Sequence, residues 1–264
     1  MGRDASGSML ARAFRLLDAF TPDRIELTVR ELAARSGVPR STTHRLVGEL
    51  LEWGALERGD RGVRLGVKLF ELGSMAPTPH RLVEGASAHL HALREATGLT
   101  ANLAIREGDH VVYLEKIGAR DLRVPHSRLG GRGELHATAL GKAILAFTPQ
   151  PEVEEYLARP LPVLTRATIT DPDALRAELA RVRRVGAAYD LAESFDGLFC
   201  VAAPVRDRRG AAIAALSVTG ATARAHAERF APAVIATARA LERELGGRAP
   251  SPAPPSRRAG RAAP

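Results

Sequence analysis

Residues 28–54 place the strongest constraint on the fold, because their spacing is that of a helix-turn-helix. Thr28 and Glu31 match a capping box, which is typical of a helix start. Gly37 can take the left-handed conformation that a tight turn needs. Pro39 then begins a second helix, where its missing N–H costs nothing. The segment therefore predicts two short helices joined by a sharp turn.

The second helix of this motif has one apolar and one polar side. Its apolar stripe consists of Leu46, Val47, Leu50 and Leu51. The polar residues at its start and on its other flank are Arg40, Ser41, Thr42, Thr43, His44 and Arg45. A helix with donors in its first turns is suited to contact base edges in the major groove of DNA. An ordinary solvated helix in a helical hairpin gives a similar pattern, and this alternative stays open here.

A β-hairpin is predicted directly after this helix. Two short alternating runs, at residues 56–58 and 63–65, flank a turn with two glycines. We expect Arg61 and Arg64 to reach phosphates or the minor groove from this wing. Upstream, one more helix is predicted by apolar residues at helical spacing, namely Leu10, Ala13, Phe14, Leu17 and Phe20. Residues 9–68 should thus form a winged helix-turn-helix domain after a disordered N-terminus at residues 1–8.

Composition limits what the rest of the chain can be. Its 264 residues, 45% of them apolar, are enough for two domains with cores of their own. The sequence has neither a long apolar run nor a hydrophobic secretory segment, so we expect a cytoplasmic protein without a membrane partner. The net charge of +8 includes four arginines in residues 247–264. The Pro, Ala and Arg content of this tail predicts disorder.

Beyond the wing, the pattern predicts a linker at residues 69–78, with a short helix that ends near Gly73 before Pro77 and Pro79 break the chain. An α+β domain is predicted at residues 79–246. Helices are expected at residues 80–97, 139–147, 152–158, 171–185 and 223–245. Strands are expected at residues 100–106, 110–117, 187–190, 199–205 and 211–219, with an extended stretch at 122–126 and a glycine-rich loop at 128–134. Together these predict an antiparallel sheet flanked by helices.

The second domain carries none of the common catalytic motifs, and its histidines lack metal-ligand spacing, so we expect no cofactor and no metal. Cys200, the single cysteine, lies in an apolar strand, which favours a buried, inert thiol. Ser217 and Thr219 share one face of the next strand. A polar cavity wall and a hydrogen-bonded edge-strand pair explain these two hydroxyls equally well. Residues 136–139 precede a helix, where free backbone N–H groups attract a carboxylate.

The order of several motifs resembles that of IclR-type transcriptional regulators. These motifs are GVPRSTTHRL, YLEKI, LHATALGKA, TITDPDAL and CVAAPV, spread between about Leu10 and Leu245. The resemblance implies an N-terminal winged helix and a GAF-like C-terminal domain that binds a small metabolite. It also implies homodimers or dimers of dimers on palindromic operator DNA, most often repressing catabolic genes. The effector site that it implies consists of backbone at Ala137, Thr138, Ala139 and Leu140 with the side chains of Asp190, Cys200, Ser217 and Thr219.

One departure from the family pattern precedes the LHATALGKA motif. Relatives usually carry an apolar residue and a proline there, whereas this chain has Gly133 and Glu134. An inward Glu134 would disfavour a simple anionic effector, and an outward one would change nothing. We expect a DNA-binding repressor whose operator affinity is controlled by a small carboxylate. The alternatives are a second domain that only dimerises, and an enzyme with Cys200 as nucleophile, for which the sequence shows no activating base.

Overall fold

The computed structural model describes residues 7–118, 124, 126–221 and 227–247. Two compact units are present, Met1–His80 and Arg81–Pro264, called here the first and second units. The N-terminal residues 1–6, most of the stretch expected to be extended at 122–126 and the tail from residue 248 lie outside the described residues. Within the described ranges, no helix has both the length and the apolar character needed to cross a membrane.

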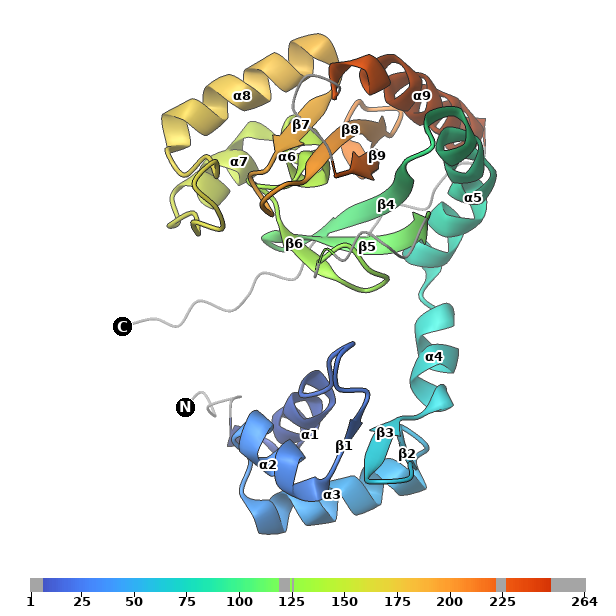
Figure 1. Ribbon diagram of the computed structural model, residues 1–264, viewed down its shortest axis with the longest axis vertical. Helices are drawn as coiled ribbons and strands as arrows, with labels where there is room; N and C mark the ends of the chain where they lie inside the picture. The colour runs from blue at the N-terminus through green and yellow to red at the C-terminus, as the bar shows by residue number, and fades with distance from the viewer. Residues whose placement is uncertain (1–6, 119–123, 125, 222–226, 248–264) are drawn as a thin grey trace. The chain divides into compact units, whose positions relative to one another are not determined.

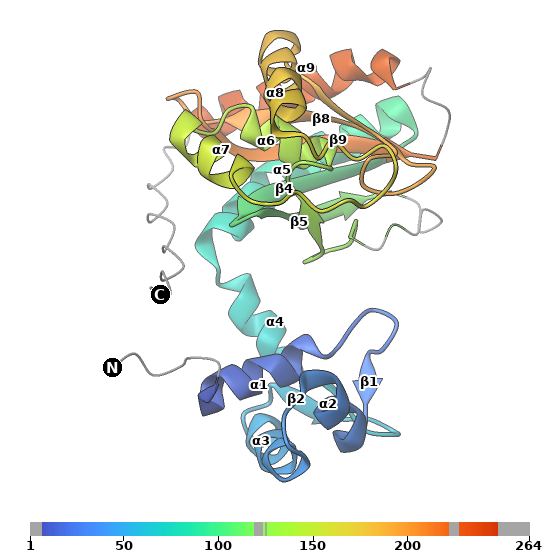
Figure 2. The ribbon, with the colours of Figure 1, turned by 90° about the vertical axis from the view of Figure 1, so that its left-hand side faces the viewer.

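The first unit begins with a helical domain and a small sheet, and α4 (Val67–Ser74) follows them within the same unit (Figure 1). The helices are α1 (Met9–Asp18), α2 (Val29–Ser36) and α3 (Arg40–Glu52). The strands are β1 (Glu26–Leu27), β2 (Leu56–Arg58) and β3 (Val63–Leu65), in the antiparallel order β1-β3-β2. Figure 2 shows the helices beside the strands of the wing. The expected hairpin is present, and β1 adds a strand that the sequence did not predict.

Local signals set the ends of α2 as expected. The Thr28 hydroxyl accepts a hydrogen bond from the Glu31 amide at 3.2 Å, and the Glu31 carboxylate accepts one from the Thr28 amide at 2.8 Å. Gly37 ends the helix with a φ of 67°, in the left-handed region. Val38 fills the turn with its side chain buried. Pro39 is the N-cap of α3 rather than its first residue.

The prediction for α1 was partly wrong, because Leu10 and Phe14 are exposed. Leu16 is the fully buried residue of this helix. The side chains that pack beside it in the core of the first unit include Met9, Ala13, Leu17 and Phe20. These positions form one continuous stripe at helical spacing, and Leu10 and Phe14 lie beside it. The helix carries more apolar residues than one face can bury.

Two helices follow the wing, α4 (Val67–Ser74) and α5 (Pro77–Thr97). The expected linker helix therefore begins two residues early and ends before the prolines. Pro77 and Pro79 do not break the chain but occupy the first turn of α5. Proline is tolerated there because the first amides of a helix have no intrahelical acceptor.

The second unit is built on a six-stranded antiparallel sheet in the order β6-β5-β4-β9-β8-β7. The strands are β4 (Thr100–Glu107), β5 (His110–Ile117), β6 (Arg132–Glu134), β7 (Ala188–Leu191), β8 (Phe199–Arg206) and β9 (Ala212–Gly220). Strand β6 lies in the segment expected to be a loop. It forms by pairing with β5, with Glu134 opposite His110. A strand of three residues is too short to show an alternating sequence pattern.

Helices cover both faces of this sheet. Helix α5 and the last helix α9 (Ala231–Gly247) pack on one face, and α6 (Ala139–Leu145), α7 (Gln150–Leu157) and α8 (Pro172–Val185) lie on the other (Figure 1). Helix α9 was expected to begin at residue 223. It begins at Ala231, after a 3₁₀ turn at Glu228–Phe230, and residues 222–226 lie outside the described chain. The fold is α+β, as predicted.

Candidate functional site

The first candidate site is the polar side of α3. Four of the six residues expected to face DNA are exposed, and Thr42 is half-buried; the exposed ones are Arg40, Ser41, His44 and Arg45. The Arg45 guanidinium is loosely paired with Glu49 at 3.8 Å, one turn further along the helix. Exposed ion pairs of this kind contribute little to stability, so the guanidinium is available to a partner.

Thr43 corrects the predicted set of DNA contacts. Its side chain is fully buried. The hydroxyl donates to the Val38 carbonyl at 3.1 Å and to the Pro39 carbonyl at 3.2 Å. Thr43 therefore ties the start of α3 to the turn before it and is turned away from any DNA. Sequence spacing placed it on the flank of the apolar stripe but gave no sign of this bond.

The wing presents both of its predicted arginines to solvent. Arg61 and Arg64 are exposed, and Arg64 forms an ion pair with Glu57 on the neighbouring strand. The Glu26 carboxylate accepts hydrogen bonds from the amides of Arg61 and Gly62, the latter at 2.7 Å. Strand β1 thus fixes the tip of the wing through a side chain that sequence reasoning did not consider.

The second candidate site lies on the face of the sheet covered by α6. Strand register places Asp190, Cys200, Thr219 and Thr100 side by side across β7, β8, β9 and β4. The next row contains Ser217, Asn102 and Lys116 on β9, β4 and β5. Directly opposed residues in a sheet share a face. The structure therefore brings three of the predicted effector residues together with Ser217, one row away.

Asn102 joins the two rows. Its Nδ2 donates to the Ser217 hydroxyl at 3.3 Å and to the Thr219 hydroxyl at 3.1 Å. The Thr219 hydroxyl donates in turn to Cys200 Sγ at 3.3 Å. On the other side, the Ser127 hydroxyl donates to Asn102 Oδ1 at 3.3 Å. Ser217 and Thr219 are thus buried, hydrogen-bonded residues and not an edge-strand pair, because β9 lies inside the sheet.

Asp190 holds the chain that follows β7. Its Oδ1 accepts from the amides of Glu193 at 2.7 Å and of Ser194 at 3.2 Å, and its Oδ2 accepts from the Ser194 hydroxyl. The Ser194 hydroxyl also lies 3.4 Å from His126 Nε2. Burial raises the pKa of Asp190, and the Ser194 and Glu193 hydrogen bonds oppose that shift. Together, the polar site consists of Asn102, Asp190, Ser194, Cys200, Ser217 and Thr219.

The predicted backbone segment at Ala137, Thr138, Ala139 and Leu140 is buried at the start of α6. Thr138 caps this helix, because its hydroxyl accepts from the Gly141 amide at 3.1 Å. Ala139 and Leu140 share one buried cluster with Cys200, which places the segment against the same face of the sheet. The structure thus gathers all the predicted effector residues around α6.

The two departures from the family pattern have separate explanations. A Cβ at Gly133 would lie 3.0 Å from Cγ2 of Thr138 and 3.4 Å from the His126 ring, so a side chain has little room there. The Glu134 carboxylate lies 3.4 Å from His110 Nε2, which is partly exposed. Glu134 thus points away from the polar site, and the alternative left open by the sequence is decided in favour of the outward position.

The electrostatics of the polar site combine hydroxyl and amide groups with the Asp190 carboxyl and two nearby cations, Lys116 and Lys142. The Lys116 ammonium donates to the Ser127 carbonyl at 2.6 Å, and no described carboxylate forms an ion pair with it. Burial lowers the pKa of Lys116. Burial and the Lys116 charge lower the pKa of His126 to about 4. Burial also raises the pKa of Cys200 to about 12, so this group is a thiol at neutral pH.

Sequence reasoning missed several residues that belong to the polar site or border it. They are Asn102, Tyr113, Lys116, His126, Ser127 and Ser194. A signal existed for Asn102, since an amide in an otherwise apolar strand requires a buried partner. Throughout the described residues, every buried side-chain nitrogen and oxygen has a hydrogen-bond partner. A ligand that enters the polar site must therefore replace bonds that the protein now makes to itself.

Comparison with known proteins gives matches over nearly the whole chain. Residues 9–60 match the family model described as IclR helix-turn-helix domain, and residues 76–243 match Bacterial transcriptional regulator IclR C-terminal. The regulator XynR of Escherichia coli is 33% identical over 241 residues, which cover 89% of this chain and 96% of that protein. Transcriptional repressor IclR of the same organism is 30% identical and covers 90% of both chains.

Solved structures show the same likeness. A crystal structure of an IclR homolog from Microbacterium hydrocarbonoxydans, complexed with 4-hydroxybenzoate, has a TM-score of 0.82 and 33% identity. The match covers 91% of this chain and 100% of that one. IclR of Thermotoga maritima has a TM-score of 0.72 and 32% identity, covering 90% of this chain and 98% of that chain.

Proposed function

The chain belongs to the IclR family of DNA-binding transcriptional regulators, and on this premise we propose that it is a repressor released or engaged by a small carboxylate. The effector binds in the polar site of the second unit, beside the Ala137–Leu140 backbone. The protein acts on palindromic operator DNA as a homodimer or a dimer of dimers. Recognition comes from α3, and the wing contacts the DNA backbone.

One observation carries the effector proposal, namely the concentration of buried polar side chains on a single face of an otherwise apolar sheet. Asn102, Asp190, Ser217 and Thr219 are each at most 4% exposed. Burying polar groups is costly unless they are fully bonded, and apolar residues would fill such a core at lower cost. A ligand that uses these groups explains why they are there.

Two features favour a carboxylate over a neutral ligand. Lys116 supplies a positive charge beside Asn102, without an ion-pair partner among the described carboxylates. Asn102, Ser217 and Thr219 supply amide and hydroxyl groups on the same face of the sheet. Hydrogen bonds to an ionised acceptor are stronger than those to a neutral one. In addition, the homolog from Microbacterium hydrocarbonoxydans was solved with 4-hydroxybenzoate, an aromatic carboxylate.

The enzyme alternative has no supporting observation. Cys200 is buried and accepts a hydrogen bond from Thr219, and its raised pKa keeps it protonated. A nucleophilic cysteine needs a neighbouring base and a lowered pKa.

The dimerisation-only alternative differs from the proposal in one measurable respect, the stabilisation of the folded protein by a small ligand. An effector that binds the native state at a hundred times its Kd stabilises that state by about 2.7 kcal/mol.

The test is an operator-binding titration with 4-hydroxybenzoate as the first probe and 4-hydroxybenzamide as its uncharged counterpart. The parent protein should change its operator affinity with the acid, by roughly 5- to 150-fold for a typical allosteric coupling, and respond less to the amide. Ser217→Ala should retain operator affinity without ligand and lose the response. Cys200→Ser should have a milder effect, because it keeps size and hydrogen-bonding capacity.

Asp190 needs a more careful design, because it also holds the amides of Glu193 and Ser194. Asp190→Asn keeps one oxygen that accepts from these amides but removes the charge and the oxygen that accepts from the Ser194 hydroxyl, whereas Asp190→Ala removes both oxygens. Loss of the response in Asp190→Ala with normal operator binding supports the site. If Ser217→Ala and Asp190→Ala respond as the parent does, the effector binds elsewhere.

A further inference from the structure

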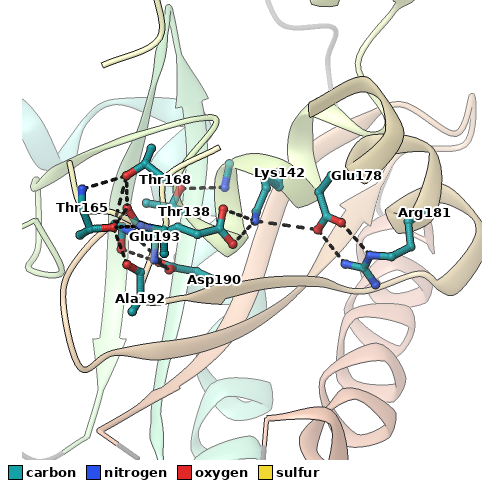
Figure 3. Close-up of polar contacts among 12 residues, drawn as sticks. Thr138, Lys142, Thr165, Thr168, Glu178, Arg181, Asp190, Ala192 and Glu193 are labelled. Carbon is teal, nitrogen blue, oxygen red and sulfur yellow. Dashed lines mark hydrogen bonds and ion pairs between the residues drawn. The ribbon is translucent and has the colours of Figure 1, made fainter. Parts of the chain in front are cut away.

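A buried ion pair between Lys142 and Glu193 lies beside the turn that follows Asp190 (Figure 3). Lys142 of α6 is fully buried, and its Nζ donates to both carboxylate oxygens of Glu193 at 2.6 Å. A second carboxylate, Glu178 of α8, lies 3.8 Å from the same Nζ. Glu178 is itself held by Arg181 through two hydrogen bonds of 2.7 Å. Charges of alternating sign therefore run from α8 through α6 to Glu193.

Glu193 lies in the connection between β7 and β8, which carries Ser194 of the polar site and is hydrogen-bonded to Asp190 at the end of β7. The amides of Glu193 and Ser194 both donate to Asp190 Oδ1. The Ser194 hydroxyl contacts Asp190 and His126. The Glu193 side chain points the other way, towards Lys142 (Figure 3). A shift of Glu193 would therefore change the positions of both Asp190 and Ser194.

The backbone of this connection is strained and held in place from a second direction. Ala192 has a φ of 65°, the left-handed region that non-glycine residues rarely adopt. The Thr165 hydroxyl donates to the Ala192 carbonyl at 2.7 Å, and the Thr168 hydroxyl donates to the Glu193 carbonyl at 2.7 Å. Strained conformations persist only where surrounding contacts impose them, and they gather at functional sites. The Lys142–Glu193 pair is the charged member of these contacts.

We propose that Lys142 and Glu193 are positioning residues of the effector site. Their ion pair holds the turn at residues 192–194 so that Asp190 and Ser194 face the ligand. This inference rests on the proposed function for its ligand, but the turn itself can be observed without one. Neither residue touches the polar site through its side chain, so the pair acts on effector affinity through Asp190 and Ser194.

The test replaces both charges at once. Lys142→Met alone would leave the Glu193 carboxylate buried without a partner, and such a single change can prevent folding. The double variant Lys142→Met/Glu193→Leu removes both charges, and apolar replacement of a buried pair is often neutral for stability. The matched control is Arg176→Met/Glu154→Leu, which removes the ion pair of 2.6 Å between α8 and α7.

Four quantities are measured on the parent and both double variants. They are the thermal midpoint, the operator affinity without ligand, the hydrogen exchange of the Glu193 and Ser194 amides, and the Kd for 4-hydroxybenzoate. We expect the Lys142→Met/Glu193→Leu variant to fold and to bind operator as the parent does. Its two amides should exchange at least about tenfold faster, because local opening no longer breaks an ion pair. Its Kd should rise at least about tenfold, within the range of typical site couplings.

The outcomes separate this proposal from the proposed function. If the double variant shows faster exchange but the parent protein does not bind 4-hydroxybenzoate, the result supports the positioning pair and counts against the proposed effector class. Unchanged exchange overturns the positioning pair. An unchanged Kd, where the parent binds 4-hydroxybenzoate, also overturns it. Equal changes in the Arg176→Met/Glu154→Leu control would show a general loosening of the second unit and overturn it as well.

Discussion

Thr43 and Arg45 are two residues apart on α3 and have different surroundings. Thr43 is buried and bonded to the Val38 and Pro39 carbonyls, whereas Arg45 is exposed. Thr43→Val should lower the stability of the first unit by about 0.5–1.5 kcal/mol, the usual net contribution of a hydrogen bond, and leave sequence preference unchanged. Arg45→Ala should leave stability unchanged and cost about 1–3 kcal/mol on a cognate operator if it contacts guanine.

These two changes are checked by thermal unfolding and by titration of cognate and random duplexes. If Arg45→Ala loses the same binding free energy on both duplexes, Arg45 contacts a phosphate instead of a base. No loss on either would contradict the DNA-binding role of this side of α3. A change of sequence preference in Thr43→Val would show that the buried orientation is wrong.

His126 gives a prediction for acid sensitivity. Its pKa in the folded protein is about 4, because burial and the Lys116 charge disfavour the protonated ring, against 6.5 for the free side chain. A lowered histidine pKa means that the unfolded chain binds more protons between these values. The contribution of His126 to the free energy of unfolding is therefore fully present above about pH 6.5. It decreases as the pH falls towards 4, by at most about 3 kcal/mol.

The measurement is the free energy of unfolding of the parent and of His126→Gln between pH 7 and pH 4. The parent should lose more stability than the variant over this interval. His136, whose pKa is also lowered by burial, is unchanged in the variant and contributes equally to both curves. Parallel curves would contradict a neutral, buried His126.

At the scale of elements, helix ends with local signals were predicted well. Thr28 and Glu31 at the start of α2 and Asp171 before Pro172 at the start of α8 form the expected caps. These signals lie within a few residues and act in any context. Pro77 gave the opposite result, because a proline between two helical segments can end the first or begin the second, depending on its neighbours.

Contacts between distant segments could not be predicted in this way. Strand β1 has two residues, and only its pairing with β3 defines it. Lys142 and Glu193 are 51 residues apart, and each alone looks like a solvated charge. The polar site shows the same limit. Resemblance to the family provided Asp190 and Cys200, whereas Asn102 and Ser194 required the strand register and the turn geometry.

The wing is the element with a direct electrostatic test. Arg61→Ala and Arg64→Ala should weaken specific and nonspecific DNA binding alike. Each should reduce the slope of log K against log salt by about one, if each arginine neutralises one phosphate. Arg64 has to exchange its Glu57 partner for a phosphate, so Glu57→Ala should strengthen binding. Arg184→Ala, an exposed arginine of the second unit, is the control. A slope equal to that of the parent would mean that the wing does not contact the backbone.

At the scale of the whole molecule, regulation requires the effector to bind one conformation better than another. The polar site belongs to the second unit and α3 to the first, with the boundary at His80 and Arg81. Under the proposed function, the chain connection through α4 and α5 is one route for coupling between them, and contacts between protomers are a second. An assembly of several copies on DNA is the simplest arrangement in which a sensor outside the DNA-binding unit changes operator affinity.

The last prediction concerns this assembly. One recognition helix contacts too few base pairs for useful selectivity, so the protein should bind operator as at least a dimer, with half-sites separated by whole helical turns. Sedimentation with a labelled duplex should give two or more chains per operator at saturation. Insertion of about five base pairs, half a helical turn, between the half-sites should reduce affinity towards that of one half-site. Insertion outside the half-sites, as control, should have no effect. One chain per operator at saturating protein concentration would contradict the dimeric arrangement.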